Sequence, residues 1–151
     1  MKKVLFIVFT ALLFVGCKKE NRIERNLWKS GGEWNIETWQ ESQTSSHYQQ
    51  DNYSETYLNA GTMRFNKDGT GSMTFQEGSS AYTDAFTYTN TETQLTIFDL
   101  EGEGVVFELD WKRNDLTLSL NESETYSSYD ENFNPIIVHS TYSLKIDCKK
   151  K

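Results

Sequence analysis

The sequence predicts an all-β protein, an antiparallel up-and-down meander of about eight strands that closes into a barrel, preceded by a short N-terminal helix. After residue 32, apolar and polar residues alternate in one segment after another, which is the period of a strand with one covered face. Short turn-forming stretches separate these segments, and none of them is long enough for a crossover helix, so neighbouring strands should pair antiparallel. Eight such strands hide their edges best by closing into a barrel.

The chain begins with a leader. Met1–Lys3 is basic, Val4–Val15 is uncharged and mostly apolar, and Gly16 and Cys17 follow. The apolar run is too short to span a bilayer and is typical of a signal peptide. Its last four residues, 14–17, resemble a bacterial lipobox, although phenylalanine stands at position 14 in place of the usual leucine.

That resemblance implies a lipoprotein signal peptide at residues 1–16 and acyl chains, palmitate among them, on Cys17. The chain would then be anchored in the bacterial cell envelope, with the outer membrane as the expected site. Lys18, Lys19 and Glu20 leave the leaflet open. The alternative is a plain secretory signal that happens to contain a cysteine.

Residues 17–31 should hold the lipidated cysteine, a tether and the short helix. Asn21–Lys29 is the helical segment, with Asn21 as the expected N-cap, and Ile23 and Leu27 share one face. Gly31 should help to end it. A simple tether without a packed helix is the alternative.

The first strand is expected from residue 32, with Trp34 and Ile36 on one face and Trp39 on the other. Residues 42–55 read as a long polar loop or a frayed hairpin end. The clearest hairpin follows, in which strands 57–65 and 70–75 flank the turn Asn66–Gly69. Gly69 can adopt positive φ there, which suits a type I turn closed by a bulge.

The remaining strands alternate in the same way. They are expected at residues 81–90, 94–100, 105–112, 116–126 and 136–146. The barrel domain should therefore cover residues 32–147, followed by a basic tail at residues 148–151.

Large apolar side chains on one face of these strands should point into the barrel. At this strand number the interior is either just filled by side chains or holds one small ligand. The candidate ligand-binding residues are Trp34, Met63, Phe65, Met73, Phe75, Phe86, Tyr88, Phe107, Leu109, Trp111 and Tyr142. Further interior positions are Ile36, Leu95, Ile97, Leu118, Val138 and Leu144.

Gly32-Glu33-Trp34, directly after a helical turn, resembles the G-x-W motif that opens the first strand of lipocalins. Together with the leader and the meander, it makes the chain similar to lipocalin-like lipoproteins of Gram-negative bacteria. The resemblance implies that the tryptophan packs at the closed end of the barrel and that a cation near the last strand covers it. No arginine follows Arg113, so Lys145 is the expected substitute.

The resemblance also implies a non-catalytic protein that binds a small apolar or amphipathic ligand. The alternative is a filled barrel that contacts a protein or a glycan through its tyrosine-rich loops. The aromatic residues in question are Trp39, Tyr48, Tyr53, Tyr57, Tyr82, Tyr126 and Tyr129, which could also serve only as strand surface pairs.

The net charge of −7 excludes a nucleic-acid partner. Removal of the leader leaves 13 basic against 22 acidic side chains, a formal charge of −9, which also argues against charge-driven adsorption to anionic lipid.

No catalytic motif, metal site or cofactor site is expected. His47 and His139 are far apart in the sequence, and the acidic side chains around residues 101–110 fall on a wet face or in a turn. Cys148 has no expected partner in the chain, and it should be an exposed thiol, part of an intermolecular disulfide, or a thiol buried near the end of the barrel.

Overall fold

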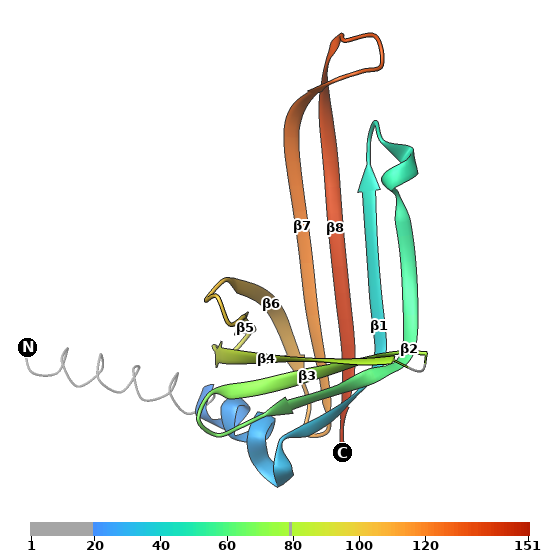
Figure 1. The fold of residues 1–151 in the computed structure, drawn as a ribbon. Helices are drawn as coiled ribbons and strands as arrows, with labels where there is room; N and C mark the ends of the chain where they lie inside the picture. Colours follow the sequence, from blue (N-terminus) through green and yellow to red (C-terminus); the bar gives the residue numbers. More distant parts are fainter. Residues whose placement is uncertain (1–19, 79) are drawn as a thin grey trace, which may run out of the picture.

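The computed structural model describes residues 20–151 except residue 79, and it confirms the expected architecture. Eight antiparallel strands form a closed barrel in chain order, with a short helix in front of them (Figure 1). The strands are β1 (Glu33–Ser45), β2 (Tyr53–Phe65), β3 (Thr70–Glu77), β4 (Ser80–Asn90), β5 (Gln94–Phe98), β6 (Gly104–Trp111), β7 (Asp115–Tyr129) and β8 (Pro135–Lys150). Among the described residues, no helix combines the length and apolarity that crossing a membrane requires.

The N-terminal helix is packed against the barrel rather than forming a loose tether. It covers residues 20–28, and Ile23 and Leu27 are each only 1% exposed. Because Glu20 is already helical, the expected N-cap at Asn21 is wrong. The expected signal peptide and Cys17 lie outside the described residues.

A 3₁₀ turn, η1 (Lys29–Gly31), ends the helix, and Gly32 follows with φ of +68°. A Cβ atom at position 32 would lie 2.0 Å from the backbone oxygen of Phe65. Only glycine fits both the left-handed backbone and this close approach, so the helix can join β1 at this point.

The strands differ greatly in length, and this divides the barrel into two parts. β2 pairs with β3 only over residues 61–65 but with β1 as far as Tyr53. β7 pairs with β6 only as far as Ser119 but with β8 as far as Tyr129. All eight strands therefore build a barrel base, and β7, β8, β1 and β2 continue beyond it as a four-stranded projecting sheet (Figure 1).

The projecting sheet consists of residues 39–45, 53–57, 120–129 and 135–144. The far side of the barrel base carries the helix, the turns at residues 66–69, 91–93 and 112–114, and the C-terminus; we call this side the base end. The helix and the projecting sheet thus lie at opposite ends of the molecule.

Two expectations about β1 and β2 are corrected. Half of the residues in the range 42–55 belong to strands, namely 42–45 of β1 and 53–55 of β2, and residues 46–52 connect the two strands. A register shift between Ile36 and Thr38 turns Trp39 onto the same face as Trp34, not the opposite face. An extra residue in one strand reverses the alternation after it, because the side-chain period of a strand is two.

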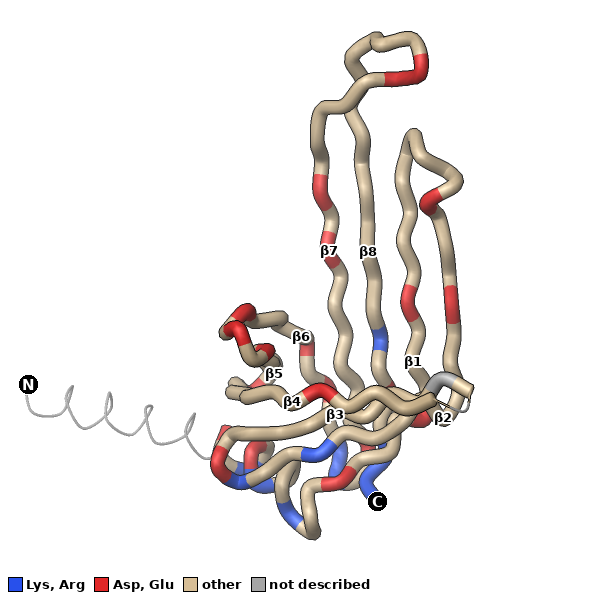
Figure 2. Tube along the Cα trace, viewed as in Figure 1, with Lys and Arg blue, Asp and Glu red and all other residues tan. Residues whose placement is uncertain are grey.

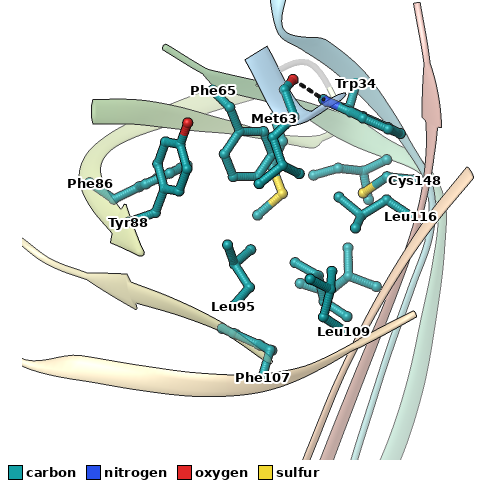
Figure 3. Close-up of a cluster of buried hydrophobic side chains, with 14 of the residues drawn as sticks. Trp34, Met63, Phe65, Phe86, Tyr88, Leu95, Phe107, Leu109, Leu116 and Cys148 are labelled. Carbon is teal, nitrogen blue, oxygen red and sulfur yellow. Dashed lines mark hydrogen bonds between the residues drawn. The ribbon is translucent and has the colours of Figure 1, made fainter. Parts of the chain in front are cut away.

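The barrel base is a packed core. Trp34 is fully buried, and its indole Nε1 donates a 2.9 Å hydrogen bond to the carbonyl oxygen of Leu27 in the helix (Figure 3). The Phe65 ring meets the rings of Phe86 and Tyr88 edge to face, at centroid distances of 5.6 and 5.0 Å. Helix, strands and rings are therefore held together by one continuous apolar cluster.

β8 is longer than expected and runs to Lys150, so part of the expected tail belongs to the sheet. Cys148 lies on this strand and is only 3% exposed. Burial, with smaller contributions from Asp147 and Glu37, raises the pKa of its thiol to about 12.

Candidate functional site

All but one of the residues expected inside the barrel gather in one core, and the exception is Val138. Trp34, Ile36, Met63, Phe65, Phe86, Tyr88, Leu95, Phe107, Leu109, Leu118, Val138 and Leu144 are buried. Met73, Phe75, Ile97, Trp111 and Tyr142 are partly buried and pack against it. Except for Val138, these side chains belong to one packed cluster. Most of them fill the barrel base, whereas Val138, Tyr142 and Leu144 lie above it on β8, in the projecting sheet.

The cation that covers Trp34 is Lys150 and not Lys145. Lys150 Nζ lies 4.9 Å from the centroid of the Trp34 ring and also donates a hydrogen bond to the carbonyl oxygen of Asn26. Lys145 instead pairs with Asp147 at 2.7 Å. Burial, followed by repulsion from Lys29, lowers the pKa of Lys150. The only sequence signal for this role was the cluster of lysines at the C-terminus.

At the top of the barrel base, three aromatic rings mark the start of the projecting sheet. Phe75 of β3 meets both Trp39 of β1 and Tyr57 of β2 edge to face, each at a centroid distance of 5.4 Å. Above this layer, the face of the sheet that continues the barrel interior is no longer covered by β3–β6 (Figure 1). We call it the inner face.

The inner face combines aromatic and acidic side chains in rows across four strands. Strand registers place Glu55, Glu41, Leu144 and Leu120 in one row, and Tyr53, Gln43, Tyr142 and Glu122 in the next. A third row contains Ser45, Ser140 and Glu124, and Tyr126 lies beyond it beside Val138. Rows are about 7 Å apart and β2 is about 15 Å from β7, given ordinary strand spacings.

The carboxylates of this face interact closely with its aromatic residues. Glu41 accepts a 3.2 Å hydrogen bond from Trp39 Nε1, and Glu55 accepts one from the Tyr57 hydroxyl. Burial raises the pKa of Tyr142, and Glu41, Tyr53 and Glu122 add to the effect. Burial, followed by Glu41 and Glu55, likewise raises the pKa of Tyr53, so the phenols of this face respond to carboxylates on β1, β2 and β7.

The connection between β1 and β2 closes the upper end of the inner face. The Tyr48 hydroxyl lies 2.7 Å from the Ser128 hydroxyl of β7, and the Asn52 side chain accepts a 2.6 Å hydrogen bond from the Ser45 amide. Between this connection and the aromatic layer is a hollow of about 510 Å³. It is lined by Gln43, Glu122, Ser123, Glu124, Ser140 and Tyr142.

The two long edges of the projecting sheet lack a neighbouring strand within the described part of the chain. On β2 this concerns residues 53–58, and on β7 residues 120–129. Their outward backbone groups could accept an added strand.

The expected aromatic residues are divided between several places. Trp39, Tyr53, Tyr57 and Tyr126 lie on the inner face and Tyr48 closes it, whereas Tyr82 is 59% exposed outside it. The four inner-face glutamates were missed by sequence reasoning. They alternate in step with the tyrosines, but only the register shows that the four strands bring them together.

The acidic side chains expected in a turn or on a wet face are exposed there, and His139 lies on the outer face of the sheet, where it contacts Thr125 at 2.9 Å. The chain matches no family model and no curated protein. The barrel fold and the chemistry of the inner face are therefore the observations from which a function can be argued.

Proposed function

We propose that the protein is a lipid-anchored interaction module of the bacterial cell envelope whose inner face binds an extended, positively charged polypeptide segment. The anchor is the acylated Cys17, three residues before the described helix. The packed barrel base then holds the four strands of the projecting sheet in a fixed arrangement. This is a non-catalytic function.

One observation carries the proposal, namely the charge of the inner face. It presents Glu41, Glu55, Glu122 and Glu124 beside five aromatic residues, and the strand registers place no lysine or arginine on it. Carboxylates attract ammonium and guanidinium groups, and tyrosine and tryptophan rings attract them through cation–π contacts. A basic segment is the complementary partner.

The open edges add a reason to expect an extended polypeptide. A strand added to the edge of β7 would run beside Glu122 and Glu124 and gain main-chain hydrogen bonds. Lysine or arginine at alternate positions would then point to the inner face, because strand side chains alternate.

An apolar ligand inside the barrel is the less favoured function. The side chains that would line such a cavity instead fill the base, as the ring contacts of Phe65 with Phe86 and Tyr88 illustrate. The hollow lined by Glu122, Glu124 and Tyr142 is polar and lies above that core. This location favours a charged partner over a lipid-like one.

Fluorescence anisotropy with labelled extended peptides tests the proposal. A peptide with alternating lysine or arginine should bind, and a peptide of the same length with serine in their place should bind at least tenfold more weakly. The triple variant Glu41→Gln/Glu122→Gln/Glu124→Gln keeps the side-chain shapes and should lose at least tenfold in affinity for the basic peptide. Added salt should weaken the wild-type complex.

The matched control is Glu101→Gln/Glu103→Gln/Glu108→Gln, which removes the same charge from exposed positions outside the inner face. It should change the affinity less than threefold. If both triple variants lost the same affinity for the basic peptide, net charge alone would explain the binding, and the proposal of a defined binding face would be contradicted. Tight binding of a neutral glycan, or an apolar molecule that copurifies with the chain, would assign a different partner.

A further inference from the structure

The positive charges of the protein are collected at the base end, although the chain as a whole is acidic. Residues 20–151 contain eleven lysines and arginines, and ten of them lie at the base end. We count there the helix, η1, the base-end turns, the two residues of each strand nearest that end, and the C-terminal residue. These ten are Arg22, Arg25, Lys29, Arg64, Lys67, Lys112, Arg113, Lys149, Lys150 and Lys151. Figure 2 shows the resulting separation, with the blue segments gathered mainly at this end. The eleventh cation, Lys145, lies further along β8, opposite Ser119 of β7.

Carboxylates at the base end are fewer than these cations. By the same definition they are Glu20, Glu24, Glu33, Asp68, Glu92, Asp110 and Asp115. The rest of the described molecule carries the other fifteen carboxylates and one cation, Lys145. The Glu33 carboxylate is already paired with Lys151 at 3.2 Å. The base end is therefore net positive, and the rest of the molecule is strongly negative.

The cations are densest around one hollow of about 400 Å³ beside the helix. It is lined by Arg22, Arg25, Asn26, Lys29, Trp111 and Arg113. Arg22 and Arg25 come from the helix, Lys29 from η1 and Arg113 from the β6–β7 turn. A 3.3 Å hydrogen bond from the Asn26 side chain to the Arg113 carbonyl oxygen connects the helix to that turn. Within residues 20–151, none of the four has a carboxylate at ion-pair distance.

This chemistry fits phosphate-bearing lipid headgroups. Guanidinium groups bind phosphate oxygens with two parallel hydrogen bonds, and tryptophan is favoured at the level of lipid headgroups. Cations near an anionic leaflet act together, and each contributes roughly a fivefold gain in binding.

The position of the anchor points to the same surface. Two residues separate Cys17 from Glu20, and an extended chain spans at most about 11 Å between these two positions. An acylated Cys17 would thus hold the base end close to the headgroups, within about one to two screening lengths at physiological salt.

We propose that the base end docks on the anionic lipid headgroups of the membrane that holds the chain, with the Arg22–Arg25–Lys29–Arg113 hollow taking headgroup phosphate. This inference rests on the lipid anchor of the proposed function. Docking at the base end would direct the projecting sheet, which lies at the opposite end, away from the membrane (Figure 1). The acidic inner face would then be repelled by the same leaflet that attracts the base end.

The test uses the full chain as purified from bacterial membranes, bound to vesicles of phosphatidylcholine alone or with about a third phosphatidylglycerol. Flotation on the neutral vesicles reports the anchor, and hydrogen–deuterium exchange reports docking. Amides of residues 20–28 and 112–114 should exchange at least threefold more slowly on anionic than on neutral vesicles, whereas the projecting sheet should not change. The difference should disappear in high salt.

The single variants Arg25→Gln and Lys145→Gln form a matched pair, because each removes one positive charge. Arg25→Gln should reduce the protection by anionic lipid, the triple variant Arg22→Gln/Arg25→Gln/Arg113→Gln should abolish it, and Lys145→Gln should leave it intact. Equal effects of the two single variants, or equal protection on both kinds of vesicle, would overturn the docking proposal. So would equal protection of the hollow by inorganic phosphate without vesicles, which would assign it to a soluble anion.

The experiment separates this proposal from the proposed function. A chain that carries no acyl groups by intact mass refutes the anchor, yet it should still float with anionic vesicles alone if the base end docks. Failure of that flotation would refute docking too. Binding of the basic peptide at the inner face is measured independently in either case.

Discussion

Replacing Trp34 by phenylalanine should separate the helix from the barrel base more than it disturbs the rest of the core. The indole Nε1 donates its hydrogen bond to Leu27 at the end of the helix, and the ring lies under Lys150. Phenylalanine keeps most of the apolar area but removes the donor. The Leu27 carbonyl oxygen is then left without this partner in a buried position.

The magnitude follows from these contacts. An unsatisfied buried acceptor costs about 1–3 kcal/mol. The cation–π attraction of phenylalanine to Lys150 is weaker than that of tryptophan, which contributes at most about 1 kcal/mol more to the loss. We therefore expect Trp34→Phe to lower the free energy of unfolding by about 2–4 kcal/mol.

Urea titration followed by circular dichroism measures this change. With a typical slope of about 2 kcal/mol per molar urea, the midpoint should fall by about 1–2 M. The control is Trp39→Phe on the same strand, where the lost hydrogen bond runs to the partly exposed Glu41, and a loss below about 1 kcal/mol is expected. If the two variants were equally stable, or if Trp34→Phe lost less than about 0.5 kcal/mol, the hydrogen bond from Trp34 to Leu27 would not hold the helix.

Other substitutions and titrations test separate parts of the structure. Phe65→Ala should cost about 3–5 kcal/mol in the same assay, because a fully buried ring in contact with Phe86 and Tyr88 is lost; a cost near that of an exposed tyrosine such as Tyr82→Ala would contradict the packed core. Gly32→Ala should cost more than about 2 kcal/mol, since the new Cβ would meet the Phe65 backbone oxygen, whereas Gly102→Ala, with open space around it, should cost less. The Cys148 thiol should resist a disulfide reagent at pH 8 in the folded protein and react at once in denaturant; rapid reaction in the native state would refute its burial. Burial, with smaller effects of Glu24 and Asp68, raises the pKa of Tyr88 from 10.0 to about 12, so the folded state holds the phenol proton more tightly than the unfolded state does. The free energy of unfolding of the wild type should therefore fall as the pH rises from about 10 towards 12. In Tyr88→Phe it should fall less over the same pH range.

Much of the barrel was predictable because its signals are local. The turn at Asn66–Gly69 has the expected positive φ at Gly69, with the Gly69 amide donating to Asn66 and the Asn66 amide to Thr70. Alternation correctly placed Phe86 and Tyr88 on the covered face, and the spacing of Ile23 and Leu27 correctly predicted a packed helix. Each of these features depends on neighbours within a few residues, so a single sequence contains them.

The lengths and register of the paired strands could not be read in this way. Residues 42–45 and 53–55 are mostly polar, yet they form strands because they pair with each other and residues 42–45 also pair with β8. The bulge after Ile36 reverses the orientation of Trp39, and alternation alone cannot reveal one inserted residue. The inner face of the projecting sheet exists only through these pairings.

Charge shows the same division between sequence and tertiary structure. The sequence by itself determined a net charge of −7 and predicted the all-β meander, and the signal peptide at residues 1–16 stays a prediction from the sequence. Only the tertiary structure decided that ten cations meet at the base end, that Lys150 covers Trp34, and that four glutamates meet tyrosines on one open face. The net charge is a sum over all residues and does not say where the charges lie. The fold gives each charge a position, and the positions determine which partner a surface can attract.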